Sequence, residues 1–214
     1  MQCKLDHIVV VAPELSVGVE FIHGTLGVAP QSGGVHPAMG THNCLLRLGD
    51  RAYLEVIAID PAAPRPRRPR WFGLDALPPD ARPRLAAWVA RADDIEQVAA
   101  AAPQLGKITP MSRGSLNWRI TVRDDGAPPL QGIGPSIIEW PAGVHPADRL
   151  PNSGCSLVRL EGHHPDPGKV SVLLGSIGFD GPFQVARPAS PGETCLIAHI
   201  QTPTGPRRLS TAQA

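Results

Sequence analysis

Aromatic and charged residues are scarce in this chain. Of its 214 residues, 4% are aromatic and 18% are charged, and 20 Lys and Arg stand against 19 Asp and Glu. So few aromatic side chains leave little surface on which nucleic acid bases could stack. A formal net charge of +1 at pH 7 also gives no overall field that attracts nucleic acid or an anionic membrane. We therefore expect neither nucleic acid nor a membrane as a partner.

Long hydrophobic runs and cysteine pairs are missing as well. No stretch reaches the roughly 20 apolar residues that a membrane-spanning helix needs. Near the N-terminus, Asp6 and His7 interrupt the short apolar run where a signal peptide would be hydrophobic. The four cysteines are widely spaced and form no Cys-x-x-Cys pair, which argues against a disulfide scaffold or a zinc ribbon. These absences predict a cytoplasmic protein.

Common catalytic signatures are absent too. The chain contains no Gly-x-x-x-x-Gly-Lys-Ser/Thr, Gly-x-Ser-x-Gly or His-Glu-x-x-His motif. We therefore expect no nucleotide cofactor. Glycine and proline, in contrast, are abundant at 22 and 25 residues, which indicates many turns and long loops rather than a helical bundle.

Between these loops, a strand–helix–strands order returns three times. The first two repeats predict paired modules within residues 1–150, at about 3–60 and 85–141, joined by an Arg/Pro-rich connection over 61–84. Residues 151–214 predict a third, degenerate module. The expected strands cover residues 5–12, 41–48, 52–59, 85–92, 115–123, 136–140, 156–160, 183–187, 194–202 and 206–210. The expected helices cover residues 13–27 and 93–102 and a segment that starts at Pro167.

Overlaying the first two modules places polar residues at equivalent positions. Tyr-Leu-Glu55 matches Ile-Ile-Glu139, and counting back from the two helices pairs His7 with Trp88. A glutamate in the middle of an apolar strand is costly unless a partner offsets its burial. Because strand side chains alternate, His7 and Glu55 are expected to point into one concavity. One histidine with one or two carboxylates there suits a divalent metal.

Four motifs, taken in order, resemble those of a known family. They are Leu-Asp-His7-Ile-Val-Val, His36-Pro-x-x-Gly-Thr-His42-Asn43, Tyr-Leu-Glu55-Val-Ile and Trp-Phe-Gly-Leu-Asp. Over roughly residues 4–165 the chain resembles the glyoxalase-like proteins of the vicinal oxygen chelate superfamily. The resemblance implies an α+β fold in which repeated βαβββ modules form a curved, mostly antiparallel sheet, an open barrel, with flanking helices. The third module is then expected either to extend this sheet or to form a homodimer.

The same resemblance implies one divalent metal ion, Zn, Mn, Fe, Co or Ni, held by His7, Glu55 and Glu139. The fourth position that the family uses falls on Trp88, which is not a metal ligand. Either His36, His42 or water completes the set, or the chain is a relative without a metal.

The function implied by the resemblance is that of a metal-dependent isomerase, lyase or dioxygenase acting on a small oxygenated metabolite. Glu55 and His42 are its expected catalytic residues, with His42 as the base. The residues expected to contact this small-molecule substrate are His36, Asn43, Asn117, Trp118 and Arg119. The alternative is a non-catalytic binding or resistance protein of the same fold, in which Trp88 and Trp118 stack on the ligand. Trp71 and Phe72 fit either a hydrophobic anchor or a lid over the site.

Overall fold

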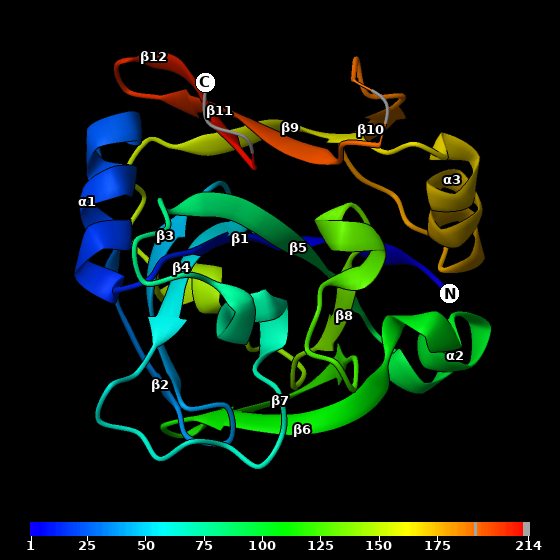
Figure 1. Ribbon diagram of the computed structural model, residues 1–214, viewed down its shortest axis with the longest axis horizontal. Coiled ribbons are helices and arrows are strands. Elements are labelled where there is room, and N and C mark those ends of the chain that lie inside the picture. The colour runs from blue at the N-terminus through cyan, green and yellow to red at the C-terminus, as the bar shows by residue number, and fades with distance from the viewer. Residues whose placement is uncertain (191, 212–214) are drawn as a thin grey trace.

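The computed structural model describes residues 1–190 and 192–211, which form two sheets and three α-helices (Figure 1). The larger sheet has eight strands in the order β2-β3-β4-β1-β5-β8-β7-β6. They are β1 (Cys3–Val11), β2 (Gln31–His36), β3 (Thr41–Arg47), β4 (Tyr53–Ile59), β5 (Arg84–Ala92), β6 (Lys107–Arg113), β7 (Leu116–Val122) and β8 (Ser136–Glu139). The smaller sheet has the order β10-β9-β11-β12, with β9 (Ser156–His163), β10 (Phe183–Ala186), β11 (Cys195–Thr202) and β12 (Gly205–Ser210). The helices are α1 (Leu15–Leu26), α2 (Ile95–Ala101) and α3 (Pro167–Ser176).

The larger sheet consists of two βαβββ halves that meet at β1 and β5. Within the first half β1 runs parallel to β4, and within the second half β5 runs parallel to β8. The two halves join through antiparallel pairing of β1 with β5. The sheet curls into an open barrel (Figure 1). The predicted fold class is therefore confirmed.

Two strands of the larger sheet have sequences that do not predict a strand clearly. Residues 28–40 fit either a loop or a short strand, and they contain β2, with the sequence Gln-Ser-Gly-Gly-Val-His. No strand was expected over β6, which contains Pro110. Both lie at the edges of the sheet. An edge strand tolerates glycine and proline because one of its sides has no partner, so its sequence does not resemble that of a buried strand.

The third module has the predicted order of elements but a different arrangement of strands. Its first strand, β9, lies inside the smaller sheet and pairs with β10 in parallel and with β11 in antiparallel orientation. The smaller sheet packs over β5 on the outer, convex side of the larger sheet (Figure 1). The expectation that this module extends the larger sheet is therefore wrong, because it forms a second layer. The homodimer stays a prediction.

Two large apolar cores result from this layering. The outer core lies between the convex face of the larger sheet, the helices and the smaller sheet, and includes Ile8, Trp88 and Leu160. The inner core fills the barrel and includes Val9, Ile57 and Trp118. None of the helices in the described residues is long and apolar enough to cross a membrane. The site described next lies at the edge of the inner core.

Candidate functional site

The Leu-Asp-His segment of β1 departs from regular strand geometry. Where β1 pairs with β5, the register shifts between Leu5 and His7, so Asp6 is an extra residue on β1. Such a β-bulge redirects neighbouring side chains. As a result the carboxylate and the imidazole of adjacent residues meet, with Asp6 Oδ1 2.7 Å from His7 Nδ1.

Asp6 is fully buried and accepts hydrogen bonds on both carboxylate oxygens. Its Oδ2 accepts from Nε2 of His145 and from Nε1 of Trp140, each at 3.0 Å. Burial alone would raise the pKa of Asp6, but the hydrogen bonds from His145 and His7 outweigh it and hold that pKa well below its usual range. Ionised Asp6 accepts the Nδ1 proton of His7, which leaves Nε2 of that ring facing Glu55.

Glu55 lies next to His7 because β4 and β1 are parallel neighbours. Its Oε2 is 3.6 Å from His7 Nε2, and its Oε1 accepts a 2.5 Å hydrogen bond from Nδ2 of Asn43. The His7 ring also stacks on Tyr53, with 4.5 Å between ring centroids. Strand pairing, a hydrogen bond and ring stacking thus fix the two titratable groups beside each other.

Asn43 links Glu55 to two further polar side chains. Its Nδ2 is 3.4 Å from Nε2 of His36, and its Oδ1 accepts a 3.3 Å hydrogen bond from Nη1 of Arg113. Burial, reinforced by the positive charge of Arg113, lowers the pKa of His36 to about 3. The neutral His36 ring then accepts from Asn43 at Nε2 and donates from Nδ1 to Oγ1 of Thr41, 3.1 Å away.

Acid is expected to destabilise the fold in two steps. As the pH falls below about 6.5, His36 is protonated in the unfolded chain, whereas in the folded chain its pKa is only about 3. The folded state therefore loses stability as the pH falls through this window. Asp6 has a lowered pKa, so its contribution is complete above about pH 4 and is lost below it.

Urea unfolding across this pH range tests the assignment. We expect His36→Gln to remove the loss of stability between about pH 6.5 and 4, and to keep the loss below about pH 4. A variant that still loses stability over the upper window as the wild type does would contradict the role of His36.

The cavity enclosed by these residues is small and mostly aromatic. Its volume is about 20 Å³, enough for about one water molecule. Trp71, Phe72, Trp118 and Trp140 form much of its wall, so the Trp71–Phe72 segment is buried in the barrel. The buried Nε1 of Trp71 has no hydrogen-bond partner among the described residues. Because an unpaired buried donor is costly, an oxygen atom that accepted from it would be stabilised.

A larger groove of about 440 Å³ shares Arg113 with this cavity. His145, the partner of Asp6, also lines the groove. On β2, a Cβ atom at Gly33 would lie 2.1 Å from Asn43 Oδ1, and one at Gly34 would lie 2.9 Å from Arg113 Cγ. Glycine at these positions lets β2 approach both side chains. Arg113 stands at the boundary between the open groove and the enclosed His7–Glu55 pair.

Glu139 is not brought to this cavity. Its carboxylate accepts hydrogen bonds from Nη2 of Arg119 at 2.7 Å and from the backbone N–H of Ile95 at 2.9 Å. Side chains alternate along β8, and Ile138 is the residue that lines the cavity. The overlay of Glu139 on Glu55 is therefore off by one residue, and the expected ligand set of His7, Glu55 and Glu139 is not assembled.

The same alternation separates the other expected site residues. On β7, Trp118 lines the cavity, whereas Asn117 and Arg119 lie on the opposite face. Arg119 instead forms ion pairs with Glu96 and Glu139.

His42 and Trp88 also face away from the cavity. On β3 the buried Asn43 points inward, so its neighbour His42 points to the other face and is not placed to act as a base. Trp88 belongs to the outer core and donates from Nε1 to the carbonyl oxygen of Ile133 at 2.9 Å. It therefore cannot stack on a ligand in the barrel. The residue opposite His7 on β5 is Val89.

The donor set does not fit a divalent metal ion. Among residues 1–190 and 192–211, no group of three or more His, Cys, Asp or Glu side chains is arranged to hold one. His7 and Glu55 provide two donors, and the facing position on β5 is the apolar Val89. The guanidinium of Arg113 is held beside Asn43 and places a permanent positive charge where a cation would bind.

Four residues of the site were not expected to be functional from the sequence: Asp6, Arg113, Trp140 and His145. Asp6 reaches its partners through a β-bulge, which no sequence pattern marks. Arg113 ends the unexpected edge strand β6. A signal did exist for Asp6, because a carboxylate inside an apolar strand needs a partner to offset its burial.

Two βαβββ half-barrels around a buried polar centre define the class of this protein. The glyoxalase-like domain family matches residues 5–177, and the chain belongs to this family, within the vicinal oxygen chelate superfamily. No curated protein shows significant sequence similarity to the chain.

Solved structures with the same architecture have low sequence identity to this chain. A hypothetical protein from Staphylococcus aureus has a TM-score of 0.61 and 14% identity, and the match covers 88% of this chain and 87% of that one. Methylmalonyl-CoA epimerase in complex with methylmalonyl-CoA and NH4+ has a TM-score of 0.45 and 19% identity, with 66% and 97% covered. The epimerase from Mycobacterium tuberculosis has a TM-score of 0.43 and 20% identity, with 64% and 87% covered. The first of these similarities supports the fold, and none of them defines a reaction.

Proposed function

We propose that this protein is an isomerase or lyase that moves a proton on a small oxygenated metabolite, with Glu55 and His7 as the acid–base pair. The observation that carries the proposal is their geometry. Two buried titratable groups face each other across 3.6 Å at a cavity, and each is oriented by a further residue. Of the three reaction types expected from the sequence, isomerisation and elimination can both begin with abstraction of a proton from carbon, which this pair can perform.

The proposed chemistry begins with proton abstraction next to a carbonyl group. A C–H bond breaks, its proton moves to the Glu55 carboxylate, and its electron pair forms a C=C bond while the π electrons of the carbonyl group move onto the carbonyl oxygen. The cation of Arg113 balances the charge that develops on this oxygen. The proton then returns to the same or a neighbouring carbon in an isomerase, whereas a lyase expels a leaving group instead. His7, oriented by Asp6, donates or accepts the second proton.

The surroundings of the pair favour a small substrate with an anionic or carbonyl end. The enclosed cavity of about 20 Å³ is too small for a metabolite, but the groove of about 440 Å³ on the other side of Arg113 is large enough for one. A substrate in the groove would reach the His7–Glu55 pair once Arg113 turned toward its oxygen atoms. Arginine suits this task because its planar fork binds carboxylate and similar groups with two hydrogen bonds.

Proton exchange with heavy water tests the proposal without knowledge of the product. We expect the protein to exchange the α-proton of at least one compound in a panel of small 2-oxo and 2-hydroxy acids and aldehydes, followed by ¹H NMR. Because the donor set does not fit a metal, the exchange rate is expected to stay unchanged after treatment with EDTA. Exchange that disappears with EDTA and returns with one divalent metal would contradict the proposed site.

A binding protein is the second candidate, favoured by the aromatic wall of the cavity. Trp71, Trp118 and Trp140 offer flat apolar faces and indole N–H donors to a ligand. This candidate predicts compounds that quench tryptophan fluorescence but show no proton exchange. It also predicts that Glu55→Gln binds these compounds about as well as the wild type.

A further inference from the structure

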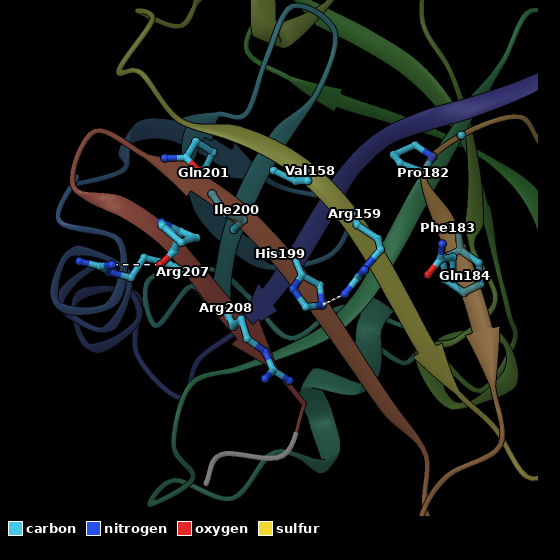
Figure 2. A pocket seen from close by; sticks show the side chains of 12 residues that line it. Val158, Arg159, Pro182, Phe183, Gln184, His199, Ile200, Gln201, Arg207 and Arg208 are labelled. Carbon is cyan, nitrogen blue, oxygen red and sulfur yellow. Dashed lines mark hydrogen bonds between the residues drawn. The ribbon is translucent and has the colours of Figure 1, made fainter.

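The outer face of the smaller sheet carries a groove of about 710 Å³ (Figure 2). It shares no lining residue with the barrel cavity. The larger sheet packs against the other face of the smaller sheet, so the barrel and this groove lie on opposite sides of it. A function of the groove would therefore be separate from the proton-transfer site.

Strand register places basic residues side by side in this groove. His199 on β11 lies directly opposite Arg159 on β9 and also opposite Arg208 on β12. Figure 2 shows the His199 ring and the Arg159 guanidinium turned toward each other, and Arg159 Nη2 is 3.0 Å from His199 Nε2. Like charges in directly opposite positions on neighbouring strands destabilise a sheet. A row of Arg, His and Arg across three strands is therefore unfavourable unless an anion lies beside it.

The carboxylate that faces this row is that of Glu161. It pairs with Arg159 at 3.2 Å, and with His163 and His199 at 3.0 Å each. Arg207 donates to the carbonyl oxygen of Pro206 and to Oγ1 of Thr204, and the Arg208 side chain forms no hydrogen bond or ion pair with the described residues. Three arginines against one glutamate leave an excess of two positive charges when both histidines are neutral.

A hydrogen-bond donor in the groove also lacks a partner. The Nε atom of Arg159 is buried and has no acceptor among the described residues. Around the basic row the wall is apolar, formed by Val158, Pro182, Phe183, Ile200 and Pro206, and Val158 is 59% exposed. An anion with an apolar part attached would match both the charge and the wall.

We infer that this groove binds a small molecule with a phosphate monoester group, which sits against Arg159, His199 and Arg208 while its apolar part packs on Val158 and Phe183. A phosphate monoester is a compact dianion at neutral pH, so it matches an excess of two positive charges. Its oxygens can accept from arginine and imidazole donors at once. The groove is a second ligand site, outside the barrel.

Isothermal titration of the full chain with phenyl phosphate tests this inference, with phenyl sulfate as a monoanion of similar shape. We expect phenyl phosphate to bind at least tenfold more tightly than phenyl sulfate. We expect Arg208→Gln and Arg159→Gln each to weaken phenyl phosphate at least tenfold, about the effect of losing one charged hydrogen bond. The matched control is Arg187→Gln, an exposed arginine outside the groove whose loss removes the same charge.

The Arg208 side chain forms no hydrogen bond or ion pair with the described residues, so Arg208→Gln is expected to fold. It can therefore still test the inference if Arg159→Gln unfolds. The inference would be overturned if Arg208→Gln bound phenyl phosphate as tightly as the wild type. It would also be overturned if Arg208→Gln and Arg187→Gln lost the same amount of affinity. So would the absence of binding at about 10 mM phenyl phosphate, a concentration that would nearly saturate a site with a Kd of about 1 mM. Binding of single-stranded DNA but not of phenyl phosphate would assign the surface to a polyanion instead.

Discussion

Replacing Glu55 with glutamine is expected to slow proton exchange at least about 10³-fold while the fold stays intact, because the substitution removes the proposed base. Glutamine has nearly the same size, and its Oε1 can still accept the hydrogen bond that Asn43 donates to Glu55. The side chain therefore stays in place but no longer accepts a proton. The measurement is the initial rate of deuterium incorporation by NMR, together with thermal unfolding of both proteins.

Glu139→Gln is the matched control for this experiment. It makes the same chemical change at the carboxylate that the module overlay pairs with Glu55. In the structure Glu139 bonds Arg119 and the start of α2 on the opposite face of the sheet. Its exchange rate should therefore remain within about twofold of the wild type. Equal losses in the two variants, or full activity in Glu55→Gln, would remove Glu55 from the reaction.

The central part of the site could be predicted from the sequence because it lies on regular buried strands. His7 and Glu55 interrupt apolar runs, and alternation along β1 and β4 is enough to direct both side chains inward. His36, Asn43 and Trp118 were also expected at the cavity. His36 and Trp118 line it, and Asn43 bonds to Glu55, which lines it. In each case the position depends on local strand geometry, which the residue pattern records.

Register across a long insertion could not be predicted in the same way. Residues 123–135 separate β7 from β8, and the overlay across them was off by one residue at Glu139. A shift of one residue in a strand turns every side chain to the other face. The pairing of His7 with Trp88 was also off by one residue, although no insertion lies between them and their helices, since Val89 is the residue that faces His7.

Long-range pairing explains what else the sequence did not predict. The third module has the same order of elements as the first two, yet its first strand lies inside its sheet rather than at the edge of the module. Element order follows from local patterns, whereas the choice of neighbouring strand depends on packing against the rest of the molecule. The boundary at residues 150–151 and the homodimer stay predictions.

Trp88→Ala is expected to lower the free energy of unfolding by about 3–5 kcal/mol. Trp88 is fully buried at the junction between β5 and the third module. Its ring stacks on Phe183 at 5.0 Å and meets Phe179 edge-on at 5.0 Å, and its Nε1 donates to Ile133. Alanine removes these contacts, leaves a cavity and leaves the carbonyl oxygen of Ile133 without its hydrogen-bond donor. The loss is a large share of the roughly 5–15 kcal/mol that stabilises a typical domain.

Urea unfolding at pH 7 measures this loss, and two further variants divide it into parts. Trp88→Phe keeps an aromatic ring between the two layers and removes the N–H donor, so it should cost about 1–3 kcal/mol, the cost of one unpaired buried acceptor. Val172→Ala changes a side chain on α3 that is 74% exposed, and should stay within about 0.5 kcal/mol. If Trp88→Ala also stayed within that range, Trp88 would not hold the third module against β5.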